Sequence, residues 1–217
     1  MTRHIFMQEL NVLNQHVIKM GSLLETSIND VIAALAHLDV KLCNDIISRD
    51  DEIDDMEHLI ERECIAMIAK QQPLATDLRK VTSIMKIVTD IERIADHCAD
   101  ISEYIIPLSK LSIVVPPNHL QEMVTAVKSM VIMTIDSFVD VNLDKANQVI
   151  AADDTVDDYF ASISNELVQI MQTNKEAIPA CVNYLMIIKY LERMADHATN
   201  IAEWIVYIIT GNLINTN

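Results

Sequence analysis

A seven-residue segment occurs twice in this chain, 100 residues apart. Residues 91–97 read IERIADH and residues 191–197 read LERMADH, so five positions are identical and two exchange one apolar residue for another. The apolar stripe around the segment repeats in the same register: Ile84, Ile87, Ile91, Ile94, Cys98, Ile101 and Ile105 against Tyr184, Ile187, Leu191, Met194, Ala198, Ile201 and Ile205. A repeat of this kind predicts a duplicated structural unit. The chain is therefore expected to consist of two related halves.

The spacing of the stripe, three and four residues, is typical of a helix packed in a left-handed bundle. Long segments rich in helix-forming residues are separated by few breakers, since the chain has two Gly and five Pro. These breakers predict six helices, at about residues 5–38, 42–71, 74–106, 118–141, 145–172 and 179–210. Short connections make consecutive helices antiparallel. The predicted fold class is all-α, with two tandem, pseudo-symmetric three-helix bundles.

The prolines and a short turn place the predicted boundaries. Asp39 and Val40 form the first turn, and Pro73 and Pro107 are expected to end the second and third helices. The longest non-helical stretch runs from residue 109 to residue 117 and is expected to be extended at residues 114–117. We therefore predict two domains, the first bundle in residues 1–110 and the second in residues 118–217.

Composition excludes several functional classes. The net charge of −16 argues against a nucleic-acid partner, because that affinity depends on clustered Lys and Arg. The acidity fits either a cation-binding protein or a highly charged solvated surface. Four Cys without a Cys-x-x-Cys pair indicate buried free thiols in a reducing compartment. The N-terminal segment is amphipathic rather than signal-like, and no apolar run reaches the roughly 18 residues of a membrane span. The predicted location is cytoplasmic.

Acidic residues recur at four-residue intervals, which places them on one face of each helix about one turn apart. The repeated helices carry one such series each, and the helices before them carry another. The predicted ligand residues are Glu92, Asp96 and Asp100 with Asp50 and Asp54 in the first half, and Glu192, Asp196 and Asn200 with Asp153 and Asp157 in the second.

Like charges at this spacing destabilise an isolated helix by a few tenths of a kcal/mol per pair, so their repetition favours a bound cation. Two acidic helices supply four to six oxygen ligands, the set preferred by Mg, Ca, Mn or Fe. For the acids of the second and fifth helices a solvated face near a helix N-terminus is an equal alternative. Asp50 and Asp153 occupy positions that the apolar period assigns to the bundle interior, so each carboxylate is expected to have a partner, a metal or a place near the end of the bundle.

Other chemistries find little support in the sequence. A ferritin-type di-iron site needs Glu-x-x-His, and this chain has Ala95 and Ala195 at the His positions. Glycine-rich phosphate loops, nucleophile elbows and His-Glu-x-x-His are absent. His97 and His197 point about 100° away from the acidic face and are expected at the surface or between helices. Arg93 is expected to pair with neighbouring acids. No nucleophile stands out, so the prediction is a protein that is not an enzyme.

The segments 92–96 (ERIAD) and 192–196 (ERMAD) resemble the duplicated Glu-Arg-Ile-Gly-Asp signature of the PhoU phosphate-uptake regulators. Residues 72–79 resemble that family's connection between helices 2 and 3, and residues 50–57 resemble its helix 2 motif. The resemblance covers essentially the whole chain. The chain departs from the signature at two positions, where Ala replaces Gly. The halves also differ from each other, because Phe160 stands at the position that corresponds to Glu57 and Asn200 at the position that corresponds to Asp100. The first site is therefore expected to have the fuller ligand set.

The resemblance implies a cytoplasmic, often homodimeric regulator that represses the phosphate-starvation response. It implies action between an ABC-type phosphate importer and a PhoR-type sensor kinase, with membrane association only through these partners. Some family members hold multinuclear metal clusters on paired acidic helices, so the expected cofactors are divalent or trivalent ions (Mg, Mn, Fe, Zn or Ca). Direct phosphate binding without metal is not favoured, because no basic cluster accompanies the acids. The alternatives are a carboxylate-bridged metalloenzyme and an acidic scaffold protein with incidental metals.

Overall fold

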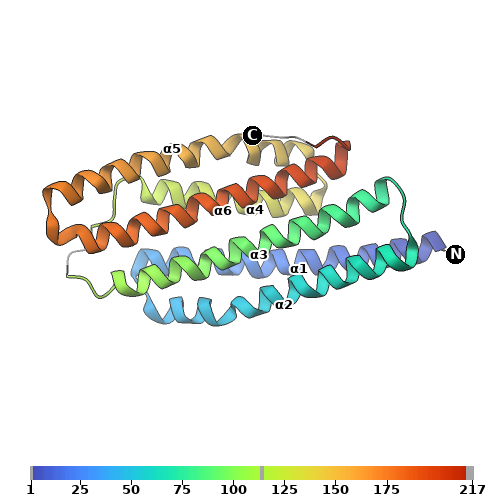
Figure 1. Ribbon diagram of the computed structural model, residues 1–217, viewed down its shortest axis with the longest axis horizontal. Coiled ribbons are helices and arrows are strands. Elements are labelled where there is room, and N and C mark those ends of the chain that lie inside the picture. Colours follow the sequence, from blue (N-terminus) through green and yellow to red (C-terminus); the bar gives the residue numbers. More distant parts are fainter. Residues whose placement is uncertain (1, 113–114, 214–217) are drawn as a thin grey trace.

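The computed structural model describes residues 2–112 and 115–213. Six long helices lie side by side along the long axis of the molecule (Figure 1). They are α1 (Thr2–His37), α2 (Val40–Gln71), α3 (Thr76–Leu108), α4 (Leu120–Asp140), α5 (Leu143–Thr173) and α6 (Ile178–Thr210), with a short 3₁₀ helix η1 (Lys175–Ala177) before α6. No strand occurs in the described ranges. The predicted all-α fold of two three-helix bundles is confirmed.

Local sequence explains where several helices begin and end. The Asp39 carboxylate accepts hydrogen bonds from the backbone N–H groups of Lys41 and Leu42 and so caps the N-terminus of α2. Asn142 accepts one from Lys145 N–H at the start of α5. Gly211 ends α6 with a φ of 81°, a conformation in which glycine has no steric penalty.

Pro107 does not end the third helix as predicted. It lies inside the last turn of α3, which continues to Leu108. The turn still closes, because the backbone N–H of Ser109 donates to the carbonyl of Ile105 at 2.9 Å. Pro107 is exposed, so the carbonyl that loses its helical donor can be hydrated. The prediction was right at Pro73, where α2 stops at Gln71.

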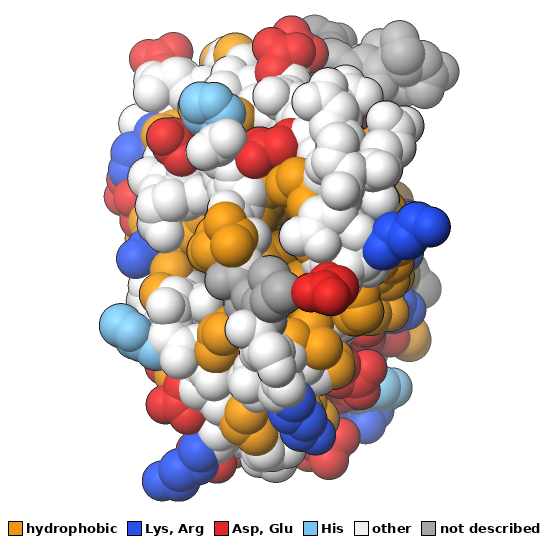
Figure 2. Space-filling view, turned by 90° about the vertical axis from the view of Figure 1, so that its left-hand side faces the viewer, with side chains coloured by type: hydrophobic (Ala, Val, Ile, Leu, Met, Phe, Trp, Pro, Cys, Tyr) orange, Lys and Arg blue, Asp and Glu red, His pale blue; other side chains and the backbone are white. Residues whose placement is uncertain are grey.

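The connection between the halves was predicted to run from residue 109 to residue 117. In the structure α3 ends at Leu108 and α4 begins at Leu120, two residues later than expected, after His119 in a left-handed conformation with φ of 62°. Ile113 and Val114 lie outside the described residues, so the predicted extended conformation is described only in part. Figure 2 shows the end of the molecule in which this connection lies, where apolar, acidic and basic side chains are interspersed.

The two halves pack against each other chiefly through α3 and α6, and also through α1 and α4. All fourteen members of the two repeated apolar stripes are buried, as expected for helices packed in a bundle. The four Cys are buried and free, also as predicted. Among the described residues, no helix has the length and apolar character needed to cross a membrane.

Candidate metal centre

The acidic faces of α2 and α3 meet in the first half. Packing of these two helices brings Asp50 and Asp54 of α2 next to Asp96 of α3. One carboxylate oxygen from each of the three residues lies within 4.8 Å of the other two. Three oxygen donors held by two helices at this separation are of the kind that a hard cation prefers as ligands.

Glu92 lies one turn before Asp96 and is the most deeply buried of the predicted ligands, with 9 % of its surface exposed. Burial, followed by the charge of Asp96, raises the pKa of Glu92 to about 7. The same two causes, in the same order, raise the pKa of Asp50 to about 6 and also raise the pKa of Asp54. A nearby cation favours the ionised form of a carboxyl. A bound metal would therefore offset the repulsion between these buried carboxylates.

Two oxygens of the cluster are buried without a hydrogen bond from any described residue: Oδ1 of Asp54 and Oε2 of Glu92. Arg93 forms the predicted ion pairs with its neighbours. Its Nε lies 3.3 Å from Glu92 Oε2, and its Nη1 donates to Asp96 Oδ2 at 2.7 Å. Buried polar atoms without a hydrogen-bond partner are rare in folded proteins. The two oxygens therefore fit the donor set of a cation site.

Asp50 belongs to this cluster, and Asp100 lies beside it. The apolar period assigned Asp50 to an interior position, and in the structure it is half-buried beside α3. The apolar period places it on the side of α2 that contacts α3, where its carboxylate meets other acids rather than the core. Asp100 lies near enough to contribute to the raised pKa of Asp50. Its Oδ2 accepts a hydrogen bond from His97 Nδ1 at 3.0 Å.

Glu57 belongs to the same acidic face and was missing from the predicted ligands. Its Oε1 accepts a hydrogen bond from Thr89 Oγ1 at 2.9 Å, and its charge contributes to the raised pKa of Glu92. The signal was available in the sequence, because Glu57 follows Asp50 and Asp54 at spacings of four and three residues on α2.

The second half places its acids less closely. On α5 and α6, burial, followed by the charges of Asp196 and Asp157, raises the pKa of Glu192. Asp157 and Asp196 are exposed, whereas Asp54 and Asp96 in the first half are half-buried. Among the residues that the structure describes, the first half alone has three acidic groups within 4.8 Å of one another. The expectation that the first site is the fuller one agrees with this geometry.

Two neighbouring polar residues of α6 contact different acids. Thr199 Oγ1 donates to Asp153 Oδ1 at 3.2 Å, so a residue absent from the prediction contacts the second acidic face. Asp153, predicted to be interior, is half-buried, for the same reason as Asp50. Asn200 was predicted as a ligand of this face, but its Nδ2 donates across the α3–α6 contact to Asp90 Oδ1 at 3.5 Å.

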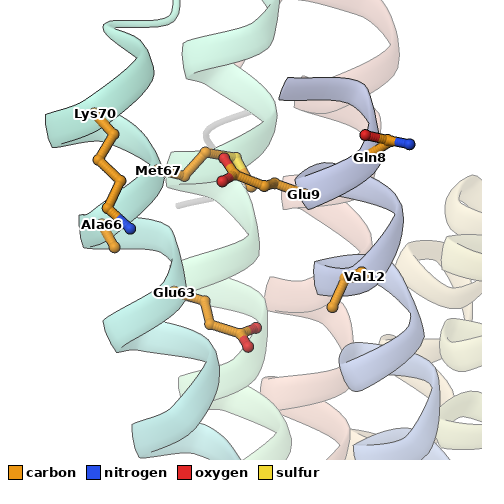
Figure 3. A pocket seen from close by; sticks show the side chains of 7 residues that line it. All are labelled: Gln8, Glu9, Val12, Glu63, Ala66, Met67 and Lys70. Atoms are coloured by element: carbon orange, nitrogen blue, oxygen red, sulfur yellow. The ribbon is translucent and has the colours of Figure 1, made fainter. Parts of the chain in front are cut away.

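A separate groove of about 320 Å³ lies between α1 and α2 (Figure 3). Its lining residues are Gln8, Glu9, Val12, Glu63, Ala66, Met67 and Lys70. Figure 3 shows the carboxylates of Glu9 and Glu63 directed toward the space between the two helices. Residue 63 is nine residues beyond Asp54, roughly 13 Å along the helix. The groove is therefore distinct from the acidic cluster.

The PhoU domain matches this sequence twice, over residues 17–105 and over residues 120–205. The chain belongs to the PhoU family. A phosphate-specific transport system accessory protein PhoU homolog from Clostridium acetobutylicum is 40 % identical over 218 residues, covering 100 % of both chains. A protein of the same name from Pseudomonas aeruginosa is 35 % identical, covering 97 % of this chain and 89 % of its own.

Solved structures of the family agree with the fold. The crystal structure of the phosphate transport system regulatory protein PhoU from Streptococcus pneumoniae matches with a TM-score of 0.90 at 32 % identity, covering 97 % of this chain and 99 % of that one. The crystal structure of PhoU from Pseudomonas aeruginosa matches with a TM-score of 0.91 at 34 % identity, covering 95 % and 100 %. The names of these relatives describe accessory or regulatory proteins rather than enzymes, in agreement with the prediction for this PhoU-family chain.

Proposed function

We propose that this PhoU-family protein is a non-enzymatic regulator of phosphate uptake whose acidic helix faces bind divalent or trivalent metal ions. The phosphate-transport part is supported by relatives that match along their full length and are named accessory or regulatory proteins of that system. The metal part rests on one observation above all: the convergence of Asp50, Asp54 and Asp96 within 4.8 Å. The buried Oδ1 of Asp54, which has no hydrogen-bond partner among the described residues, supports the same assignment.

In this proposal Asp50, Asp54, Glu92 and Asp96 hold the ion of the first half, and Asp153, Asp157, Glu192 and Asp196 form a weaker second site. Asp96 is half-buried, so an ion bound there keeps a side open to a partner. The metal-bearing faces dock a homodimer of the protein on the cytoplasmic side of an ABC-type phosphate importer and relay its state to a sensor kinase. Oxygen-only donors favour Mg, Mn, Fe or Ca over softer metals.

The metal assignment is tested on protein purified without chelator. We expect wild-type protein to retain metal, measured by inductively coupled plasma mass spectrometry, and Asp50→Asn/Asp96→Asn protein to lose the ion of the first half. Metal binding to the folded state also stabilises it by mass action, by about 2.7 kcal/mol at 100 times Kd. Addition of the metal found should raise the Tm of wild-type protein more than that of the double variant, which keeps only the weaker second site.

Asp51→Asn/Asp55→Asn protein is the matched control, because both residues are exposed acids on α2 beside the proposed ligands. It loses the same charge but should retain the metal. Equal metal content in Asp50→Asn/Asp96→Asn protein and wild-type protein would contradict the assignment.

An acidic scaffold with incidental metals is the rival that the net charge of −16 favours. The two are separated by binding the protein to membranes that contain the phosphate importer, with and without chelator. Metal-dependent docking is lost on chelation. Binding that relies on surface charge persists in the presence of chelator and weakens steeply as the salt concentration is raised.

A further inference from the structure

Two histidines and two carboxylates form a line along the contact between α3 and α6. His197 Nδ1 lies 2.8 Å from Asp90 Oδ1, and His97 Nδ1 lies 3.0 Å from Asp100 Oδ2. The two imidazole centroids are 5.6 Å apart. The expectation that these histidines lie at the surface or between helices is confirmed. The His97–Asp100 pair has the three-residue spacing of neighbours on one helix face, whereas the contact of His197 with Asp90 could not be read from the sequence.

The hydrogen bonds define which nitrogen of each ring is free. A carboxylate accepts hydrogen bonds, so Nδ1 of each histidine carries the proton, and the neutral ring then has a lone pair on Nε2. Nδ1 and Nε2 of an imidazole bond in widely different directions, so the Nε2 lone pair of each ring is directed away from the carboxylate that Nδ1 contacts. Asp90 and Asp100 are ten residues apart on α3, about 15 Å. The 5.6 Å between the two ring centroids is compatible with two imidazoles bound to one ion at Zn–N distances of about 2.0–2.1 Å.

Burial makes the free nitrogen of His97 unusual. His97 is 7 % exposed, and its Nε2 has no hydrogen-bond partner in the described part of the chain. A buried polar atom of this kind calls for a ligand or a water. The side chain of His197 is 22 % exposed, so the space between the rings is accessible from solvent on that side.

We propose that His97 and His197 together bind one Zn²⁺-class ion through their Nε2 atoms. Imidazole nitrogen suits Zn²⁺, Ni²⁺ and Cu²⁺, whereas Mg²⁺ and Ca²⁺ prefer oxygen. A metal-binding histidine usually donates its other N–H to a carboxylate or carbonyl, which fixes its tautomer and orientation. Asp90 and Asp100 occupy those outer positions. The site differs in chemistry from the carboxylate clusters and links the two halves, since one histidine comes from each.

The test uses the full chain with excess Mg²⁺ to occupy the oxygen-rich sites, and Zn²⁺ as the probe. Isothermal titration should find a Zn²⁺ site that is lost in His197→Ala protein and weakened roughly 10–100-fold in Asp90→Asn protein, the effect typical of an outer carboxylate partner. Histidine-selective ¹⁵N NMR should show Zn²⁺-dependent shifts of Nε2 in His97 and His197. His37→Ala protein removes an exposed histidine at the end of α1 and should bind Zn²⁺ like wild-type protein.

Asp50→Asn/Asp96→Asn protein separates this inference from the proposed function. Retention of the Mg²⁺-insensitive Zn²⁺ site in that variant supports an independent histidine site, whereas its loss there would assign the Zn²⁺ to the carboxylates. Unchanged Zn²⁺ affinity in His197→Ala protein, or NMR shifts confined to other histidines, would overturn the proposal. The Tm of each metal-free variant is measured alongside, so that lost binding is compared only among folded proteins.

Discussion

At the scale of single residues, Glu92 shows how the acidic cluster opposes folding in the absence of a cation. It is 9 % exposed, and burial followed by the charge of Asp96 raises its pKa to about 7, above the ordinary value of 4.5. The folded protein therefore binds a proton at Glu92 more tightly than the unfolded chain does. By linkage, the contribution of Glu92 to the free energy of unfolding of the metal-free protein is fully present below about pH 4.5 and is lost as the pH rises through 7.

Glu92→Gln should remove the part of the pH dependence that Glu92 contributes. In chelator at pH 8 we expect the variant to be more stable than wild-type protein by about 1–3 kcal/mol, because one pKa unit corresponds to about 1.4 kcal/mol. At pH 4.5 the two should be nearly equal. Urea unfolding at both pH values measures the difference. Glu103→Gln, at an exposed position of α3, serves as the control and should follow wild-type protein. A Glu92→Gln variant with the wild-type pH profile would contradict this account of the cluster.

At the scale of elements, the first turn of α2 depends on Asp39. Its Oδ1 lies 3.0 Å from Lys41 N and 3.1 Å from Leu42 N, so it satisfies two N–H groups that have no partner within the helix. The helix that it begins carries half of the candidate metal centre. The cap therefore contributes to placing Asp50 and Asp54 opposite α3.

Asp39→Ala should destabilise the protein by about 1 kcal/mol, the usual effect of losing an N-cap side chain. Chemical denaturation of metal-free protein measures the change. Asp45→Ala is the matched control, since it removes the same charge from an exposed position of α2 beyond the cap. Equal losses in both variants would attribute the effect to charge and not to capping.

At the scale of the whole molecule, the two halves are joined by α3 against α6 and by α1 against α4. Gly21, inside α1, lies where α1 meets α4. A Cβ atom built there would be 3.0 Å from Cγ2 of Ile135. Glycine weakens a helix interior by about 1 kcal/mol relative to alanine, so its presence in α1 fits the close approach of α4.

Gly21→Val should lower the free energy of unfolding by about 1–3 kcal/mol, the range for overpacked cores. Ser22→Val introduces the same side chain at the adjacent exposed position and should change stability by less than about 0.5 kcal/mol. Thermal unfolding of both variants tests the contact. A Gly21→Val variant as stable as the Ser22→Val variant would show that α1 and α4 have room to separate.

Local patterns in the sequence are enough to predict the duplicated all-α fold and the face of each helix that carries acids. Both follow from local regularities: an apolar period of three and four residues decides which side of a helix is buried, and a four-residue spacing aligns Glu92 with Asp96 on one face. Pro107 shows the limit of such local rules. A proline was expected to end the third helix, but α3 continues through Pro107 to Leu108.

Which of these groups come into contact depends on how the helices pack. Asp50, Asp54 and Asp96 come within 4.8 Å of one another, while the corresponding acids of the second half stay more open despite similar spacing. His197 reaches Asp90, 107 residues earlier in the chain. Such contacts depend on how far one helix is displaced along its neighbour. That displacement is set by the packing of all the apolar side chains between the helices, and a shift of one turn, about 5.4 Å, would separate every one of these pairs.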